Sequence, residues 1–462
     1  MYSHKEITEI ILKIEAEFEV NSIKFQGVLI WPLIRNHIAS KLLQGSGNVD
    51  LSPLPPLNKT KRCVLSVFFF LYRIRAYRHF CKLKRFRGAA IYISRDDEHK
   101  RDFYGSRNYL AEGWLSLNEK VIDSKILRLS DPYIESLFAE YKKFYPALRG
   151  YVNIENLDSF FTYLDSVKKI PFDARSLYRE LGNIFALSLL FRDLFKYMRT
   201  PAVFYSVFFH TNSYAAALAT MPLKTISVEV QHGQQGKYSP LNTNFSSIPN
   251  EGYHLLPKVF WTWGEVSYER KKEFNASQYH KVIIGGHPRL STFLKLEKVE
   301  AKWKNEKRTV MLALQDVPEP IPPFFIKTLS ELTETHEFWI RLHPNMLNKL
   351  EDFEEKFKSY PNVKVKWPST EDLYLLLLKS NFVLTLWSTV VYEGLALGCK
   401  GILLSTNGVE LMEESVSKNE ILYAGDSRRL CELLQKEGRP ERASFICSDL
   451  GLITNEIKKV YS

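Results

Sequence analysis

Short apolar runs recur along the chain from residue 200 onward, and most are separated by stretches long enough for a helix. This alternation is typical of βα units, in which buried parallel strands read as nearly continuous apolar segments. The polar stretch Leu294–Arg308 interrupts the series and is the best candidate for a domain boundary. The pattern therefore predicts an α/β protein with two doubly wound, Rossmann-like domains that face a cleft. Nine strands are predicted, at Ala202–Phe208, Thr225–Val230, Val259–Trp263, Val282–Ile284, Val310–Leu314, Phe338–Leu342, Val363–Val365, Phe382–Leu386 and Gly401–Leu404.

The first 200 residues follow a different pattern. Helices are predicted at Lys5–Phe18 and Trp31–Leu43, followed by a proline-rich linker at Leu51–Thr60. A short strand is predicted at Ala89–Ile93, and residues 115–200 have mostly helical spacing. We therefore divide the chain into a helical, basic N-terminal extension (1–88), a first Rossmann-like domain (89–300), a second (301–445) and a C-terminal helix (446–462) expected to pack back on the first.

The composition is that of a globular protein, with 45% hydrophobic and 25% charged residues. A chain of 462 residues exceeds what one hydrophobic core usually serves. Its five cysteines are odd in number and include no CxxC pair, which argues against a disulfide framework or a structural zinc site and fits a reducing cytosol. The N-terminus lacks the apolar region of a secretory signal, so a cytoplasmic location is predicted.

The net charge of +11 is concentrated in one segment. Leu51–Arg95 holds eleven Lys and Arg residues and no Asp or Glu, which leaves 52 basic against 52 acidic residues elsewhere. Its apolar run Cys63–Tyr72 is too short to span a bilayer. Residues 59–87 are therefore either a peripheral anchor on an anionic membrane or a core helix with a solvated basic end. Nucleic acid is a third partner for such charge, but no recognition motif accompanies it.

Residues 382–398 carry the strongest functional motif. A buried strand ends at Ser388 and Thr389, a helix follows, and Gly398 closes it. Backbone N–H groups at a helix start favour phosphate, and the two hydroxyls add donors. Glu393, one turn into the helix, is placed to hold ribose hydroxyls. The alternative is a capped helix with an exposed glutamate, although a capping box requires the acid at Val391 or Tyr392.

A second motif ends the strand before Pro344. Arg341 and His343 are two residues apart and share a strand face, and Pro344 keeps His343 extended. An arginine and a histidine together suit a diphosphate or a leaving phosphate, whereas the alternative is a strand end with a structural histidine. The dipeptide alone has little specificity, because His287 and Pro288 form another.

Two further strand ends supply candidates for a general base. His232 follows the strand at 225–230 and begins a glycine-containing loop, and an imidazole with an ordinary pKa near 6.5 suits base catalysis. Asp96 and Asp97 follow the first strand, and either carboxylate is a candidate for the same role. A structural histidine and an ordinary acidic loop remain the alternatives. The sequence has no P-loop, no HExxH and no DxD in a strand–loop context, which disfavours a metal-dependent GT-A enzyme.

Several of these segments occur together in one known group. QHG at 231–233, WTWGE at 261–265, GGHPR at 285–289, RLHP at 341–344 and LWSTVVYEGLALG at 386–398 resemble, in order and spacing, bacterial capsule and surface-polysaccharide glycosyltransferases. That group includes capsular Kdo transferases, CDP-glycerol glycerophosphotransferases and polysialyltransferases. The chain departs from it at residues 398–401, where many relatives have Gly-x-Pro. The acidic-acidic-Gly motif of the sialyltransferases has only Asn250-Glu251-Gly252 as a counterpart.

The resemblance implies a GT-B fold and metal-independent sugar transfer without a cofactor. It implies that the second domain holds the nucleotide sugar, of CMP or CDP type, through His343, Pro344, Ser388 and Thr389. The first domain would take a surface polysaccharide or its lipid-linked precursor at the inner face of the plasma membrane, with His232 facing the acceptor or acting as base. Gly233 and Arg289 are expected on the acceptor side or in loops. A sugar-nucleotide 2-epimerase and a non-catalytic, membrane-associated assembly protein are the alternatives.

Overall fold

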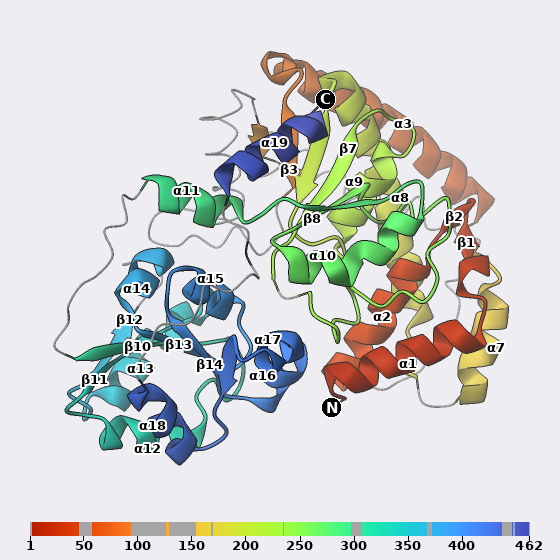
Figure 1. Ribbon diagram of the computed structural model, residues 1–462. Helices are drawn as coiled ribbons and strands as arrows, with labels where there is room; N and C mark the ends of the chain where they lie inside the picture. The colour runs from red at the N-terminus through yellow and green to blue at the C-terminus, as the bar shows by residue number, and fades with distance from the viewer. Residues whose placement is uncertain are drawn as a thin grey trace.

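The computed structural model describes residues 2–45, 58–93, 126–128, 154–167, 170–233, 235–296, 307–366, 372–436, 446 and 449–461. Within these residues the chain forms two separate six-stranded sheets, one early and one late in the sequence (Figure 1). Every strand pair in both sheets is parallel. The predicted α/β fold with two doubly wound domains, the GT-B arrangement, is confirmed.

The first sheet has the strand order β4-β3-β6-β7-β8-β9. Each of its strands except β4 and β9 is buried along its whole length or nearly so, which explains the nearly continuous apolar runs in the sequence. The strands are β3 (Ala90–Ile93), β4 (Ile126–Arg128), β6 (Ala202–Tyr205), β7 (Ile226–Val230), β8 (Val259–Thr262) and β9 (Lys281–Ile284). The described part of the region predicted as mostly helical is mostly helical, with β4 and the two-residue strand Ile154–Glu155 as exceptions. Residues 115–125 and 129–153 of that region lie outside the described residues.

The second sheet has the order β12-β11-β10-β13-β14-β15. All nine strands predicted from residue 200 onward are present in the two sheets, with ends shifted by a few residues. The prediction missed β15, which has only three residues. The strands are β10 (Arg308–Ala313), β11 (His336–Arg341), β12 (Val363–Lys366), β13 (Phe382–Thr385), β14 (Lys400–Leu403) and β15 (Ile421–Tyr423).

Helices from the start of the chain share a hydrophobic core with one face of the first sheet. Buried Arg35 fixes this packing, because its guanidinium donates to the Glu15 carboxylate and to the backbone carbonyls of Pro240 and Thr243. A small antiparallel sheet, of β1 (Lys24–Phe25), β2 (Val28–Leu29) and β5 (Ile154–Glu155), lies beside them. The helices are α1 (His4–Glu17), α2 (Trp31–Gln44), α7 (Leu157–Val167), α8 (Ala174–Met198) and α9 (Thr211–Thr220).

The last helix, α19 (Leu450–Tyr461), covers the other face of the first sheet. Its Ile453 and Val460 pack in one core with Tyr92 and Trp261. In Figure 1 this dark blue helix lies among the elements of the first domain, although it follows the second domain in the sequence.

Two cores enclose the second sheet, and one of them extends into the first domain. Helices α12 (Pro323–Glu331), α13 (Leu350–Phe357) and α18 (Ser427–Gln435) cover one face. Helices α14 (Leu373–Lys379) and α15 (Val390–Ala396) cover the other, where Trp263, Val266 and Leu290 from the first domain join the same core. The two domains are therefore packed together here rather than only tethered.

Helix α3 (Lys59–Lys82) covers most of the predicted basic segment 59–87. Tyr72, Ala76 and Phe80 are buried against the first domain, so one face of the helix belongs to the core, as one of the two predicted alternatives required. Its opposite face is exposed. No helix in the described part of the chain is both long enough and apolar enough to cross a bilayer.

Candidate functional site

Two predicted motifs from different domains meet where the sheets face each other. Gly233 follows β7 of the first sheet, and Thr389 precedes α15 of the second. A Cβ atom placed on Gly233 would lie 3.9 Å from the Thr389 side-chain methyl group. The two strand-end loops are therefore in near contact, although 155 residues separate them in the sequence.

The second sheet has its topological switch point at this junction. Its strand order reverses between β10 and β13, which is where doubly wound sheets open a crevice for ligands at the carboxyl ends of their strands. Gln315, just beyond β10, reaches across this point and accepts a hydrogen bond from the Trp387 backbone N–H at 2.9 Å. Sequence reasoning missed Gln315, although a polar residue directly after a buried strand was a signal that it overlooked.

Ser388 is held in a defined conformation. Its backbone N–H donates to the Thr385 hydroxyl at 3.1 Å, and its own Oγ accepts from the Val390 backbone N–H at 3.3 Å. The Ser388 hydroxyl is the acceptor in this bond, so its own hydrogen is not used there. Thr389 is the N-cap residue of α15 and makes no side-chain capping bond, so no capping box forms there. Gly398 has a φ of +91° just beyond the end of this seven-residue helix, which favours glycine.

Glu393 is buried, which rules out the alternative of an exposed helix-dipole glutamate. The Tyr374 hydroxyl donates to its Oε1 at 2.7 Å, and the His287 Nε2 lies 3.6 Å from the same oxygen. Burial raises the pKa of Glu393, against the opposing effect of the Tyr374 hydrogen bond. The predicted ribose-binding carboxylate therefore already has protein partners.

Residues of the GGHPR segment complete a polar network across the domain junction. Arg289, in α11 (Pro288–Leu296), donates to the Asp372 carboxylate at 2.6 Å, and its guanidinium lies 4.5 Å from the Tyr374 ring centroid. Burial, assisted by the Arg289 charge, lowers the pKa of His287 to about 3. His287 is therefore neutral at physiological pH. This network could not be predicted from local sequence patterns, because Asp372 and Tyr374 belong to the other domain.

Close packing explains the glycine pair that precedes His287. A Cβ atom on Gly285 would lie 1.8 Å from the Trp261 indole, so no larger residue fits there without movement of the ring. The Trp261 Nε1 donates to the Gly286 carbonyl at 2.9 Å and fixes the turn after β9.

His232 is exposed at the end of β7, between two anchored neighbours. The buried Gln231 side chain donates to the Gly233 carbonyl and to the Ser267 hydroxyl, both at 2.9 Å, and accepts from the Trp263 backbone N–H at 2.7 Å. After burial and the Arg289 charge, a positive charge on His232 adds to the lowering of the pKa of His287. Gln231 belongs to the QHG segment at 231–233, but the sequence alone indicates no role for it. Asp96 and Asp97 lie outside the described residues.

Arg341 and His343 are at the carboxyl end of β11. Arg341 is 6% exposed, and its positive charge opposes the rise that burial causes in the pKa of Glu393. His343 is half-buried two residues later, and Pro344 begins a 3-10 helix, Pro344–Lys349.

The junction thus combines an exposed imidazole from the first sheet with cationic and hydroxyl groups from the second. Such a set can bind an anionic ligand and accept a proton beside it. Within the described ranges, no group of three or more His, Cys, Asp or Glu residues is arranged to hold a metal ion.

No family model and no curated protein matches the sequence. Solved structures with a similar arrangement include the UDP-GlcNAc 2-epimerase of Methanocaldococcus jannaschii, with a TM-score of 0.47 and 15% identity over 80% of this chain and 99% of that chain. The UDP-GlcNAc 2-epimerase of Neisseria meningitidis has a TM-score of 0.46 and 16% identity over 80% and 98%. The wall teichoic acid polymerase TagF has a TM-score of 0.41 and 10% identity over 88% and 93%.

Proposed function

We propose that the protein is a glycosyltransferase that moves a sugar from a nucleotide-activated donor to a hydroxyl of a bacterial surface polysaccharide or its lipid-linked precursor. The observation that carries this proposal is the near contact of Gly233 with Thr389. This contact supports the proposal, because His232 directly precedes Gly233 and Ser388 directly precedes Thr389 in the sequence. The motif resemblance favours a CMP- or CDP-activated donor.

The second domain takes the nucleotide in this proposal. Arg341 and His343 supply positive charge and hydrogen-bond donors to the leaving phosphate, and the Ser388 and Thr389 hydroxyls donate to its oxygens. Stabilisation of the charge on the leaving phosphate lowers the barrier most when the hydrogen-bond donors are fixed beforehand. The hydrogen bonds around Ser388 hold that residue in this way. Glu393 binds the ribose hydroxyls of the donor or, through its hydrogen bond with Tyr374, supports the protein surface beneath the ribose.

The first domain takes the acceptor. His232 removes the proton of the acceptor hydroxyl while the oxygen forms a bond to the anomeric carbon. The bond from that carbon to the phosphate oxygen breaks, and the nucleotide leaves with the electron pair. Asp97 is the second candidate for the base. The cationic groups take the place of a divalent metal, so we expect activity to persist in EDTA. Full loss that manganese restores would contradict that part of the proposal.

The transfer takes place on the cytoplasmic side of the membrane in this proposal. Two measurements test the function. A thermal-shift screen with CMP, CDP, UDP and GDP identifies the nucleotide, and a stabilising shift is expected for at least one of them. Turnover of the corresponding nucleotide sugar is then followed with and without a glycan acceptor. Acceptor-dependent release of nucleotide supports the proposal, conversion of the free donor sugar indicates an epimerase, and no nucleotide binding indicates an assembly protein.

A further inference from the structure

Helix α3 presents an apolar face to solvent. Seven of its large hydrophobic side chains are 48% to 62% exposed. They account for most of the eleven exposed large hydrophobic residues in the described part of the chain. A concentration of this kind marks an interaction surface rather than ordinary scatter. We call these side chains the α3 apolar face: Val64, Val67, Phe68, Phe70, Leu71, Ile74 and Tyr77.

The helix is anchored so that this face stays outward. Phe69, Tyr72, Ala76 and Phe80 pack on the first domain from the opposite side of the helix. Arg73 forms a two-bond ion pair with Asp193 of α8, with both donor–acceptor distances at 2.7 Å. Arg73 therefore holds the helix in place and does not belong to the outward charge.

Basic side chains extend the outward surface beyond the apolar face. Arg78, Lys84 and Arg85 are exposed, and no acidic residue occurs from residue 51 to 95. The Arg87 side chain donates to the Tyr197 carbonyl at the end of α8, which joins this segment to a neighbouring basic surface.

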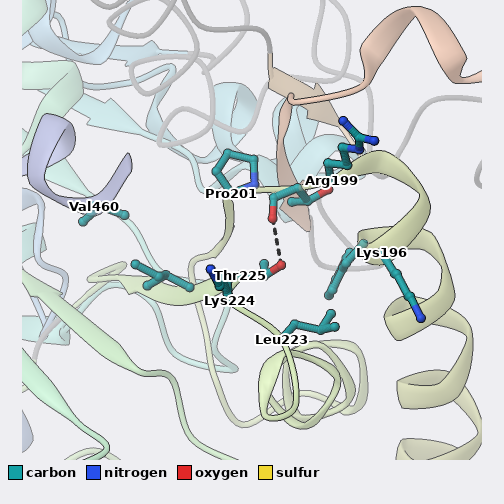
Figure 2. Close-up of a pocket in the computed structure, with 10 residues that line it drawn as sticks. Lys196, Arg199, Pro201, Leu223, Lys224, Thr225 and Val460 are labelled. Carbon is teal, nitrogen blue, oxygen red and sulfur yellow. Dashed lines mark hydrogen bonds between the residues drawn. The ribbon is translucent and has the colours of Figure 1, made fainter. Parts of the chain in front are cut away.

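That neighbouring surface surrounds a cavity of about 380 Å³ (Figure 2). Lys196, Arg199 and Lys224 line it, and none of the described residues that line it is Asp or Glu. The cavity lies beside the amino ends of β6 and β7, at the opposite edge of the sheet from His232. A negatively charged surface can therefore approach here without covering the candidate site.

We propose that α3 docks the protein peripherally on an anionic lipid surface, with the α3 apolar face in the interface and Arg78, Lys84 and Arg85 at the headgroups. An interfacial helix requires this combination of exposed apolar side chains and adjacent bases. A second copy of the chain is a poorer partner, because a symmetric contact through this face would oppose like charges. The inference adds a lipid partner to the proposed function. It is argued only from the exposed surface of α3 and the adjacent bases, so it does not depend on that function.

The test is sedimentation of the full chain with vesicles of phosphatidylcholine alone and of phosphatidylcholine with added phosphatidylserine. We expect strong binding only to the anionic vesicles, with release as salt rises. Equal recovery with both vesicles, or with neither, would overturn the inference. Nucleotide-induced thermal shifts on the same samples keep the two proposals distinct, because loss of lipid binding should leave those shifts unchanged.

Matched variants locate the surface. Val67→Ser/Leu71→Ser/Ile74→Ser removes apolar contact, and Arg78→Glu/Lys84→Glu/Arg85→Glu reverses charge. Each should weaken binding to anionic vesicles at least tenfold, with an unchanged circular dichroism spectrum. The control Lys327→Glu/Lys356→Glu/Lys358→Glu makes the same charge change on the second domain and should bind within twofold of the wild type. Equal losses of vesicle binding in all three variants would contradict the assignment of the lipid-binding surface to α3. A wild-type dimer that dissociates in the serine variant would also contradict it.

Discussion

The two sheets have the same number of strands and the same parallel arrangement, but their carboxyl edges differ in chemistry. The edge of the second sheet carries Arg341, His343 and a Ser388 loop held by side-chain hydrogen bonds. The edge of the first sheet offers one exposed imidazole, His232, between residues fixed by Gln231. Cationic and hydroxyl groups suit binding of an anion, whereas an exposed imidazole suits proton transfer. Under the proposed function, the second sheet therefore binds the donor and the first performs chemistry on the acceptor.

The largest effect is expected at the first edge. His232→Ala removes the proposed base and should lower kcat by roughly 10²- to 10⁴-fold with little change in nucleotide affinity. Steady-state kinetics and nucleotide titration of the same variant measure both quantities. His254→Ala, which alters a histidine elsewhere in the first domain, is the control. A kcat within threefold of the wild type would exclude His232 and leave Asp97 as the candidate.

A difference in stability should separate two glycines of the first edge. Gly285→Ala forces a methyl group into the Trp261 indole and should cost about 1–3 kcal/mol or more of unfolding free energy. Gly233→Ala meets only an ordinary contact at 3.9 Å and should unfold like the wild type. Urea unfolding of both variants tests this, and equal midpoints would show that the close packing of Gly285 is not maintained in solution.

The polar network between the domains predicts a dependence of stability on pH. Burial lowers the folded-state pKa of His287 to about 3, below its ordinary value of 6.5. The unfolded chain therefore binds a proton that the folded chain does not. The contribution of His287 to stability is complete above pH 6.5 and is lost as the pH falls toward 3, by about 1.4 kcal/mol per pH unit.

The variant His287→Asn isolates this contribution, because asparagine keeps a polar side chain without titrating. Its unfolding free energy should fall less steeply than that of the wild type between pH 6.5 and pH 4. The residues that contact the His287 ring or influence its pKa are unchanged in the comparison. They are Glu393, Arg289, Tyr374, Trp263 and His232. Identical slopes of unfolding free energy against pH in the two proteins would show that burial does not lower the pKa of His287.

The strands could be predicted because each reads locally as an apolar run, as at Phe382–Leu386. Strand β15 was missed, and only Ile421 of its three residues is buried. The strand-end motifs also located the edges at which His232, Arg341 and Ser388 lie. The partners of His287 and Arg289 could not be predicted, because Glu393 and Asp372 belong to the other domain and reach them only when the two domains pack together.

Helix α3 shows the same limit. The run of apolar residues at 63–72 has no clear helical periodicity, so its buried face could not be identified from the sequence. That face is set by α8, more than 100 residues away, through contacts such as Arg73 with Asp193.

Nucleotide titration across the two edges tests the contrast between the sheets most directly. Isothermal calorimetry would compare Arg341→Gln, His343→Ala, the double variant Ser388→Ala/Thr389→Ala and His232→Ala with the wild type. Loss of a hydrogen bond to a charged group costs about 1.5–3 kcal/mol, so the variants of the second edge should bind roughly 10- to 150-fold more weakly. His232→Ala should bind with wild-type affinity. Unchanged affinity in all variants of the second edge, with a loss confined to His232→Ala, would contradict the assignment of the nucleotide to the second domain.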